Sequence, residues 1–497
     1  GSDTISISNS GEVVDTTPAC CADSDERTYG RVHGTSEFAV LATPTPGAAN
    51  GAAAMLAAPS PVFEPTRGFF AAPFDLTVSA AGASLTVSCT VDGSDPSVGG
   101  AQIATSGAPP LTIRVDPAGG ASRTWAAPSV GVRCVTSGAS LRPSATATHT
   151  YIFPEAVLDQ PEHVPEGSGV FWTTAMTLNG ADADASRAEQ LAALSAIPTM
   201  SIAMPHEELF GVQGIHRGPN LEEDDYEFGA SVELLYPDGD ARWAGFDGFQ
   251  VDAGVRIQGG GGRWREGEYD HKQSFSLKFR TEYGYSKLKY PVFESAPLNA
   301  AGAADEFDTL ILRAGHNKGW GSTWDSKNTV YTRDQFSRDL QIAVSGAGSH
   351  GTFVYLYLNG LFWGLYNLVE RPDHNFQAAY FGGDGDDYYA GKHRGGDISG
   401  DDSAFELFKS TVSKSSDYGA VAAALDVPNY IDQTLLAAYS AVGDYPQYYF
   451  GQRMLPTQGP LRFFMWDIED SWGGGSRRSG VNYDASDDPQ FDRFDET

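Results

Sequence analysis

The sequence has few cysteines, few basic residues and no long apolar run. Its 497 residues include four cysteines, and 33 Lys and Arg against 64 Asp and Glu give a net charge of −31. No stretch reaches the roughly 18–20 consecutive apolar residues of a membrane span. Because an acidic surface repels other polyanions, nucleic acid and anionic membranes are not expected as partners. A nucleotide remains compatible with this charge, because a few local cations and Mg²⁺ can hold it.

Short motifs of several enzyme classes are also missing. The chain has no Gly-x-Ser-x-Gly elbow, no His-Glu-x-x-His and no paired Cys-x-x-Cys, so serine hydrolases, zincins and zinc modules find no support. Cys89 and Cys134 each lie in a β-strand pattern. They either face each other as a disulfide on paired strands or are two buried free thiols. The pairing of Cys20 and Cys21 is left open.

Composition along the chain divides it into four parts. Hydrophobic residues make up 41% and aromatic residues 12%, enough for ordinary cores, and the length predicts two to four domains. Residues 1–50 are β-prone and turn-rich, as in part of an all-β module, and 51–61 are a linker of small residues and proline. Residues 62–153 alternate short strands and turns, which predicts a β-sandwich. Residues 154–497 place strands before helices, which predicts an α+β domain.

Local patterns in the last part predict its elements. Asn359-Gly360, between two apolar runs, is the strongest hairpin signal in the chain. LRFFMWDIED is an apolar strand that ends in acidic residues. Four segments have helical patterns: TRDQFSRDLQIAVS, DHNFQAAYFG, SAFELFKSTV and NYIDQTLLAAYSAV.

Four segments of this part, taken in order and spacing, resemble the spore coat protein H (CotH) kinase-like family. They cover about 235–475 and are GVRIQGGGGRW with HKQSFSLKFRTEYGYSKLKYPVF, then FVYLYLNGLFWGLYNLVERPDHNF, GDYPQYYF and FFMWDIEDSWGG. The flanks agree: DERTYGRVHGTSEFAVLATPTPGAAN resembles the end of a lamin-tail domain. PVFEPTRGFF, TVDGSDPS and ATATHTYIF resemble a chitobiase/β-hexosaminidase C-terminal-like sandwich.

The resemblance implies an atypical protein kinase. Such a domain binds ATP with Mg²⁺ or Mn²⁺ and phosphorylates Ser or Thr of secreted or surface proteins. Because the flanking modules accompany this domain in secreted bacterial proteins, the chain is expected outside the cytoplasm. The family's C-terminal extension is expected to be missing, because the chain ends soon after the WDIED segment.

Phosphoryl transfer needs one carboxylate to hold the metal and another to orient the nucleophile. Asp467 ends an apolar strand, where the backbone fixes the direction of a ligand. The resemblance assigns Asp467 as the principal metal ligand, Glu469 as a second ligand or a supporting acid, and Asp444 as the catalytic base. The family has a metal-binding Asn a few residues after the base; Gln447 stands in this stretch and is longer. The plain alternative for these acids is a solvated turn.

The phosphates need cations nearby. In SFSLKFR, strand alternation puts Ser276, Lys278 and Arg280 on one face. The resemblance matches Lys278 to the phosphate-contacting Lys, with Lys272 as the alternative. It matches Glu370 to the acid that pairs with this Lys or with a metal. A Lys on an exposed edge strand is the plain alternative for Lys278.

Other candidate residues have weaker signals. Arg263 follows four glycines whose backbone N–H groups could contact phosphates. Lys392 matches a family Lys that contacts nucleotide, and Arg313 is either a further cation of the site or part of a buried structural ion pair. Asp373 is expected to cap the following helix. Acidic glycine-rich segments could bind Ca²⁺, although none has the spacing of a twelve-residue calcium loop.

Two other functions stay open. The first is a catalytically inactive, kinase-like surface or adhesion protein, favoured by Gln447 and by the two β-modules. The second is a carbohydrate-associated protein, suggested by the resemblance of residues 62–153 to a glycosidase appendage.

Overall fold

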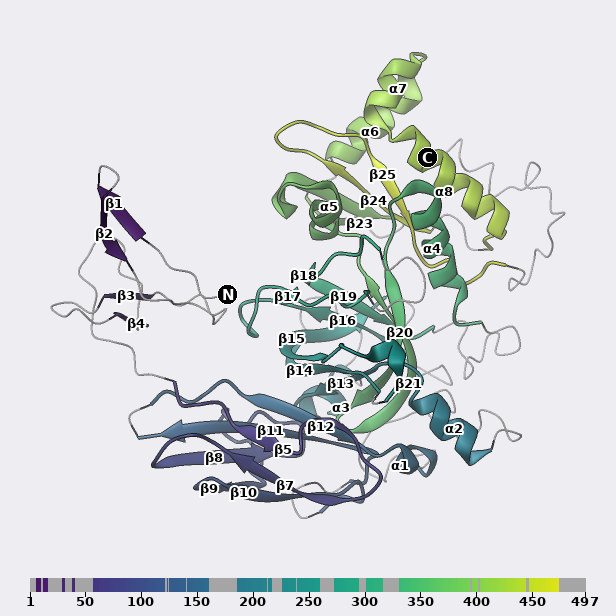
Figure 1. Cartoon of the computed structure of the whole chain (residues 1–497). Coiled ribbons are helices and arrows are strands. Elements are labelled where there is room, and N and C mark those ends of the chain that lie inside the picture. The colour runs from purple at the N-terminus through teal and green to yellow at the C-terminus, as the bar shows by residue number, and fades with distance from the viewer. Residues whose placement is uncertain are drawn as a thin grey trace. The chain divides into compact units, whose positions relative to one another are not determined.

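The computed structural model divides the chain into two compact units (Figure 1). The first unit holds Gly1–Ala126, Val130–Ile152 and Ala203–Pro205, and the second holds Ala127–Ser129, Phe153–Ile202 and His206–Thr497. The structure describes residues 6–9, 12–16, 29–31 and 38–40 as backbone, and 57–120, 123, 125–139, 141–160, 186–211, 213–216, 226–237, 239–259, 272–294, 301–315, 330–393, 396–400, 403–443 and 447–472.

The first unit begins with two short antiparallel pairs. Strand β1 (Ser6–Asn9) pairs with β2 (Glu12–Thr16), and β3 (Tyr29–Arg31) pairs with β4 (Phe38–Val40). The lamin-tail-like origin of this segment stays a prediction.

Two larger sheets follow in the first unit, in the orders β10-β7-β5 and β6-β12-β11-β8-β9. Alternate residues of β7, such as Leu76 and Val78, are fully buried, which is the pattern of strands with one face in a core. The strands are β5 (Val62–Glu64), β6 (Gly68–Phe69), β7 (Phe74–Ser79), β8 (Leu85–Thr90), β9 (Thr105–Gly107), β10 (Leu111–Val115), β11 (Ser129–Gly138) and β12 (Ala147–Ile152).

A disulfide joins the two cysteines of this sheet. Cys89 in β8 lies directly opposite Cys134 in β11, both side chains are fully buried, and their sulfur atoms are bonded. Of the two alternatives that the sequence left open, the structure therefore has the disulfide.

His149 in β12 makes the stability of this unit depend on pH. Its ring stacks on Phe63 with centroids 4.1 Å apart, and its Nδ1 accepts a hydrogen bond from the backbone N–H of Arg67. Burial, with the nearby charge of Arg67, lowers the pKa of His149 to about 3. Between this value and 6.5 the unfolded chain binds a proton that the folded chain does not, so stability falls as the pH falls.

We therefore expect the free energy of unfolding to be about 2 kcal/mol lower at pH 5 than at pH 7 through this one side chain. Urea denaturation of the full chain at the two pH values measures it. A His149→Gln variant keeps a hydrogen-bond acceptor but cannot titrate, so its loss between the two pH values should be smaller by that amount. An equal loss in both proteins would contradict the prediction.

The second unit contains a closed barrel in the order β13-β14-β15-β16-β19-β21-β20 (Figure 1). Its last two strands form the hairpin predicted at Asn359-Gly360, and both turn residues have positive φ, 46° and 87°, as a tight two-residue turn requires. The strands are β13 (Thr199–Ala203), β14 (Phe228–Leu235), β15 (Phe249–Gln258), β16 (Ser274–Lys278), β19 (Thr309–Arg313), β20 (Gly351–Leu358) and β21 (Leu361–Glu370).

A four-stranded sheet follows the barrel, in the order β23-β22-β24-β25. Helices α4 (Arg333–Ser345) and α8 (Val427–Ser440) pack against each other and against β25. The strands of this sheet are β22 (Tyr388–Lys392), β23 (Gly396–Ser399), β24 (Tyr448–Arg453) and β25 (Arg462–Met465).

Shorter elements complete the second unit. They are α1 (Pro154–Leu158), α2 (Arg187–Leu194), α3 (His206–Phe210), η2 (Ala241–Trp243), β17 (Leu288–Lys289), β18 (Glu306–Phe307), α5 (His374–Phe381), η6 (Gly385–Asp387), α6 (Ser403–Lys414) and α7 (Tyr418–Ala424). Among the described helices, none is long and apolar enough to cross a membrane. The structure is thus rich in β-sheet with a smaller number of helices, while the assignment of the β-modules to particular families stays a prediction.

Candidate functional site

One wall of the barrel carries the predicted cations on a single face. In the paired strands β16 and β19, Lys278 lies opposite Thr309 at one end, and Arg313 is the last residue of β19 at the other end. Because side chains alternate along a strand, Thr309, Ile311 and Arg313 share a face, and Lys278 shares it through its pairing. At ~3.3 Å per residue, the two cations are separated by about 13 Å along the strand.

An apolar cluster lies between the two charged ends. Ile311 in β19 and Val369 in β21 pack with aromatic side chains of α5, of β24 and β25, and of the residue after β25: Phe376, Tyr449, Phe464 and Trp466. The polar groups at the two ends of this wall are therefore separate sites, and each has its own chemistry.

Arg313 is the centre of the first site. Its Nη2 donates to Asp467 Oδ1 at 2.6 Å and to Glu469 Oε2 at 2.9 Å. Its Nε lies 2.9 Å from Asp334 Oδ2, and its guanidinium lies over the Trp466 ring, 4.8 Å from the centroid. The structure thus brings together three residues that the sequence nominated, Arg313 and the two acids, and adds Asp334.

Three elements position these side chains. Arg313 ends β19, Asp334 is in the first turn of α4, and Asp467 and Glu469 follow β25. Asp467 has φ 61°, a left-handed conformation that only Gly, Asn and Asp adopt readily, so the chain turns sharply directly after the strand. Asp334 also accepts the backbone N–H of Ile468 at 3.0 Å, which ties the helix to that turn.

The site has three acidic and two basic side chains. Asp334, Asp467 and Glu469 face Arg313 and Arg338, whose Nη1 donates to Asp334 at 2.6 Å. Burial, together with the charge of Asp467, raises the pKa of Glu469 to about 8. Burial alone would also raise the pKa of Asp334, but Arg313 and Arg338 hold it below its usual value. Asp334 is therefore paired, whereas Asp467 and Glu469 compete for one guanidinium nitrogen.

The carboxylates of Asp467 and Glu469 fit a divalent cation whose other ligands are substrate phosphates and water. In the described part of the chain, no three Asp, Glu, His or Cys side chains are arranged to hold a metal ion. Mg²⁺, however, is usually bound by one or two carboxylates together with substrate phosphates and water. The side chain of Asp467 is 39% exposed, while Glu469 beside it is 14% exposed. Asp467 and Glu469 thus suit the two-carboxylate case.

Lys272 lies toward the Arg313 end of the wall. It comes two residues before Ser274, whose hydroxyl accepts the backbone N–H of Ala314, the residue after Arg313. Its Nζ donates to the carbonyl of Leu365 at 2.6 Å and lies over the rings of Tyr331 and Tyr366, 4.9 and 4.8 Å from the centroids. Of the two candidate phosphate lysines, Lys272 is the one at the Arg313 end of the strands, but it is buried, and its Nζ is held by Leu365.

Lys278 has a different environment at the other end. Its Nζ donates to Thr309 Oγ1 at 2.9 Å. Burial and the neighbouring charge of Arg371 lower the pKa of Lys278 to about 8. The structure therefore places Lys278 away from Asp467 and Glu469.

Glu370, the expected partner of Lys278, binds other groups. Its Oε2 accepts the backbone N–H of His350 at 2.8 Å and lies 3.0 Å from His350 Nδ1, while its Oε1 accepts the hydroxyl of Tyr380 at 2.7 Å. No ion pair joins Glu370 to Lys278 among the described residues. Asp373 is confirmed as the cap of α5, because its Oδ1 accepts the backbone N–H of Phe376.

The remaining candidates are placed less informatively. Lys392 is half-buried at the end of β22, opposite Tyr449 of the apolar cluster, and Gln447 is half-buried just before β24. Asp444 and Arg263 lie outside the described residues.

Sequence reasoning missed Asp334 and Arg338. They stand four residues apart on α4, and both are almost completely buried, at 5% and 0% exposed. An acid–base pair at this spacing on a helix usually lies in solvent. Gln335, Phe336 and Ser337 stand between them, and because Phe336 is 42% exposed, no apolar pattern indicates that this face of the helix is buried.

Comparison with known proteins supports the predicted resemblance over part of the chain. The family model of the CotH kinase protein matches residues 255–496, which include Lys272, Arg313, Asp334, Asp467 and Glu469. No curated protein matches the sequence. The resemblance to the CotH kinase family is confirmed for residues 255–496, while the lamin-tail and chitobiase-like resemblances remain predictions.

Proposed function

From the similarity of residues 255–496 to the CotH kinase protein, we propose that this region is an atypical protein kinase. It binds ATP with Mg²⁺ or Mn²⁺ and transfers the γ-phosphoryl group to Ser or Thr of a secreted or surface protein. The observation that carries the proposal is the contact of Arg313 Nη2 with both Asp467 and Glu469, at 2.6 and 2.9 Å. A phosphate-binding cation beside two metal-binding carboxylates is the minimum set of parts for this reaction.

The order of the parts along the chain supports the same conclusion. In protein kinases, a strand Lys that contacts the phosphates pairs with an acid on the next helix, and a metal-binding Asp comes later. Here Arg313 on β19 pairs with Asp334 on α4, and Asp467 follows β25. Arg313 and Asp334 therefore take the roles that the sequence suggested for Lys278 and Glu370.

The residues have separate tasks in this proposal. Asp467 and Glu469 would hold the divalent cation, whose charge would offset that of the phosphate oxygens. Asp334 remains bound to Arg313 Nε and fixes the position of the side chain. Nη2 can therefore leave the two carboxylates and bind a phosphate. Lys272 adds a second positive charge on the same side. Asp444 keeps its predicted role as the base that orients the acceptor hydroxyl.

Nucleotide binding is tested by ligand-dependent stabilisation. ATP at ten times its dissociation constant is expected to raise the free energy of unfolding of the full chain by about 1.4 kcal/mol. Thermal unfolding is measured with ATP plus Mg²⁺, Mn²⁺ or Ca²⁺, and with each metal or ATP alone. Transfer of label from γ-labelled ATP to the protein or to a co-secreted protein then tests the reaction. Stabilisation by none of the metal–ATP combinations would contradict the proposed function.

A second candidate is a kinase-like binding protein without activity. It is favoured by Gln447, in the stretch where the family has an Asn, and by the two predicted β-modules. This candidate predicts stabilisation by ATP without any transfer of label, or no stabilisation at all.

A location outside the cytoplasm is part of the proposal. The disulfide between Cys89 and Cys134 supports it, because structural disulfides persist mainly in oxidising compartments. The predicted β-modules before residue 154 also support a location outside the cytoplasm, because such modules accompany this domain in secreted proteins.

A further inference from the structure

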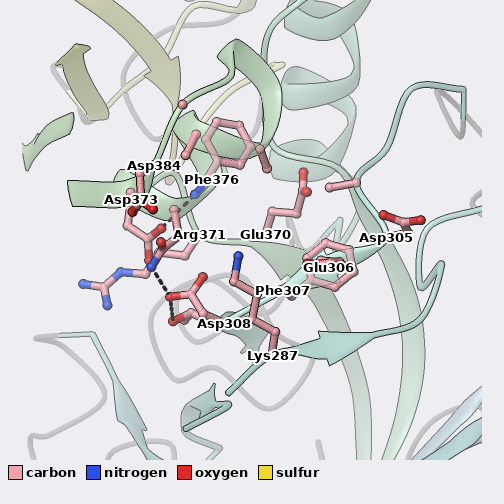
Figure 2. A pocket seen from close by; sticks show the side chains of 17 residues that line it. Lys287, Asp305, Glu306, Phe307, Asp308, Glu370, Arg371, Asp373, Phe376 and Asp384 are labelled. Atoms are coloured by element: carbon pink, nitrogen blue, oxygen red, sulfur yellow. Dashed lines mark hydrogen bonds between the residues drawn. The ribbon is translucent and has the colours of Figure 1, made fainter. Parts of the chain in front are cut away.

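A cavity of about 460 Å³ lies in the second unit, at the opposite end of β19 from Arg313 (Figure 2). Its walls come from the start of β19 at Thr309, the end of β21 at Glu370, the first turns of α5, and the segment around β18. The cavity is therefore separate from the Arg313 site, and the proposed function does not use it.

The walls of the cavity are strongly acidic. They include six carboxylates and only two cations, Lys287 and Arg371, so the formal charge is 2 − 6 = −4. The acidic residues are Asp305, Glu306, Asp308, Glu370, Asp373 and Asp384, which Figure 2 shows around the same space. A triphosphate would be repelled here, so the cavity suits a ligand of the opposite charge.

Asp373 is a deeply buried carboxylate of the cavity wall. Its side chain is 3% exposed and lines the cavity. Its Oδ1 caps α5, but within the described residues no hydrogen bond reaches its Oδ2. Burial and the neighbouring Asp308 raise the pKa of Asp373 despite the nearby charges of Arg371 and Lys278. Glu370 differs, because His350 and Tyr380 satisfy both of its oxygens.

The shape of the cavity favours an organic cation over a metal ion. No three ligating side chains of the described chain are arranged around one point, as a metal ion held by protein ligands alone would require. The volume is also many times the ~30 Å³ share of one water molecule. Phe307, Phe376 and two alanines of α5 line the same space and can cover an aliphatic stem. A guanidinium or ammonium group would meet the carboxylates beyond this apolar part.

We propose that this cavity binds an organic cation, namely the guanidinium or ammonium group of a basic side chain or of a polyamine. Asp373 and Asp384 contact the charged group, and the apolar part of the wall contacts the stem. Binding here goes beyond the proposed function and does not require nucleotide.

Binding is measured on the full chain at low salt by fluorescence anisotropy. The probe is a labelled Gly-Ser peptide with three Arg, and the same peptide with Gln in place of Arg is its control. The Arg peptide is expected to bind, and the double variant Asp373→Asn/Asp384→Asn is expected to bind it at least about tenfold more weakly. Competition by spermidine or by arginine amide distinguishes a small cation from a basic peptide as the natural source.

The matched control is Asp417→Asn. Asp373, Asp384 and Asp417 each cap a helix through a side-chain oxygen, and Asn keeps that function, so the double variant and the control should both fold. Equal binding by the double variant and the wild type would overturn the proposal, and so would equal weakening in Asp417→Asn. Displacement of the peptide by ATP with Mg²⁺ would overturn it as well, since the cavity would then belong to the nucleotide site. These outcomes are independent of the ATP-dependent stabilisation that tests the kinase function.

Discussion

An Asp467→Asn variant is expected to lose phosphoryl transfer by about 10²–10³-fold while its folded structure persists. The substitution removes the negative charge that would hold the divalent cation but keeps an oxygen that can accept from Arg313. The backbone at this position has φ 61°, a conformation that Asn adopts as readily as Asp. The change therefore removes the charge with little effect on the turn after β25.

The measurement is the single-turnover rate of label transfer from γ-labelled ATP, with thermal unfolding recorded on the same samples. Asp240→Asn is the control, because Asp240 is an acid of the same unit that caps η2 and is paired with Arg242 rather than with Arg313. Wild-type transfer by Asp467→Asn would exclude Asp467 as a metal ligand. A similar loss in Asp240→Asn would mean that the effect is not specific to the site.

The sequence predicts the local parts of this site but not their pairing. An apolar strand that ends in acidic residues identifies Asp467 and Glu469, and the position of Asp373 before a helix identifies a helix cap. Both can be predicted because each depends only on neighbouring residues in the sequence. The partners of Arg313 depend instead on tertiary contacts: Asp334 is 21 residues away, and Asp467 is 154 residues away. No periodicity within one element carries that information.

Strand register explains why Lys278 lies away from Asp467 and Glu469. Alternation correctly puts a Lys of β16 and Arg313 of β19 on one face. Lys278 and Arg313 occupy opposite ends of that face because Lys278 pairs with Thr309, at the start of β19. This register depends on the pairing of all strands of the barrel and not on one local segment. The contacts of Glu370 also depend on strand pairing, because its partner His350 directly precedes the neighbouring strand β20.

An Arg313→Met variant is expected to lower the free energy of unfolding by about 3–5 kcal/mol, as removal of one partner from a buried ion network does. Met preserves much of the length and the apolar stem, so the loss comes from the charge. Asp334 retains Arg338 at 2.6 Å, whereas Asp467 and Glu469 lose the guanidinium that both contact. Urea denaturation measures the loss. Arg187→Met is the control, because Arg187 also bridges two acids, Glu155 and Asp159, but does so on the surface, where such contacts contribute little.

The same variant tests whether Asp467 and Glu469 can hold a cation. With Arg313 gone, the two carboxylates are unopposed, so Mg²⁺ or Mn²⁺ should stabilise Arg313→Met more than it stabilises the wild type. Adding Asp467→Asn should remove this extra stabilisation, because one of the two ligands is then neutral. If the metals stabilise Arg313→Met and the wild type equally, the carboxylates do not form a cation site and Arg313 is a structural ion-pair residue. If the extra stabilisation is present, Arg313 and the metal compete for the same oxygens, and metal binding is the event that releases Arg313 to the phosphates.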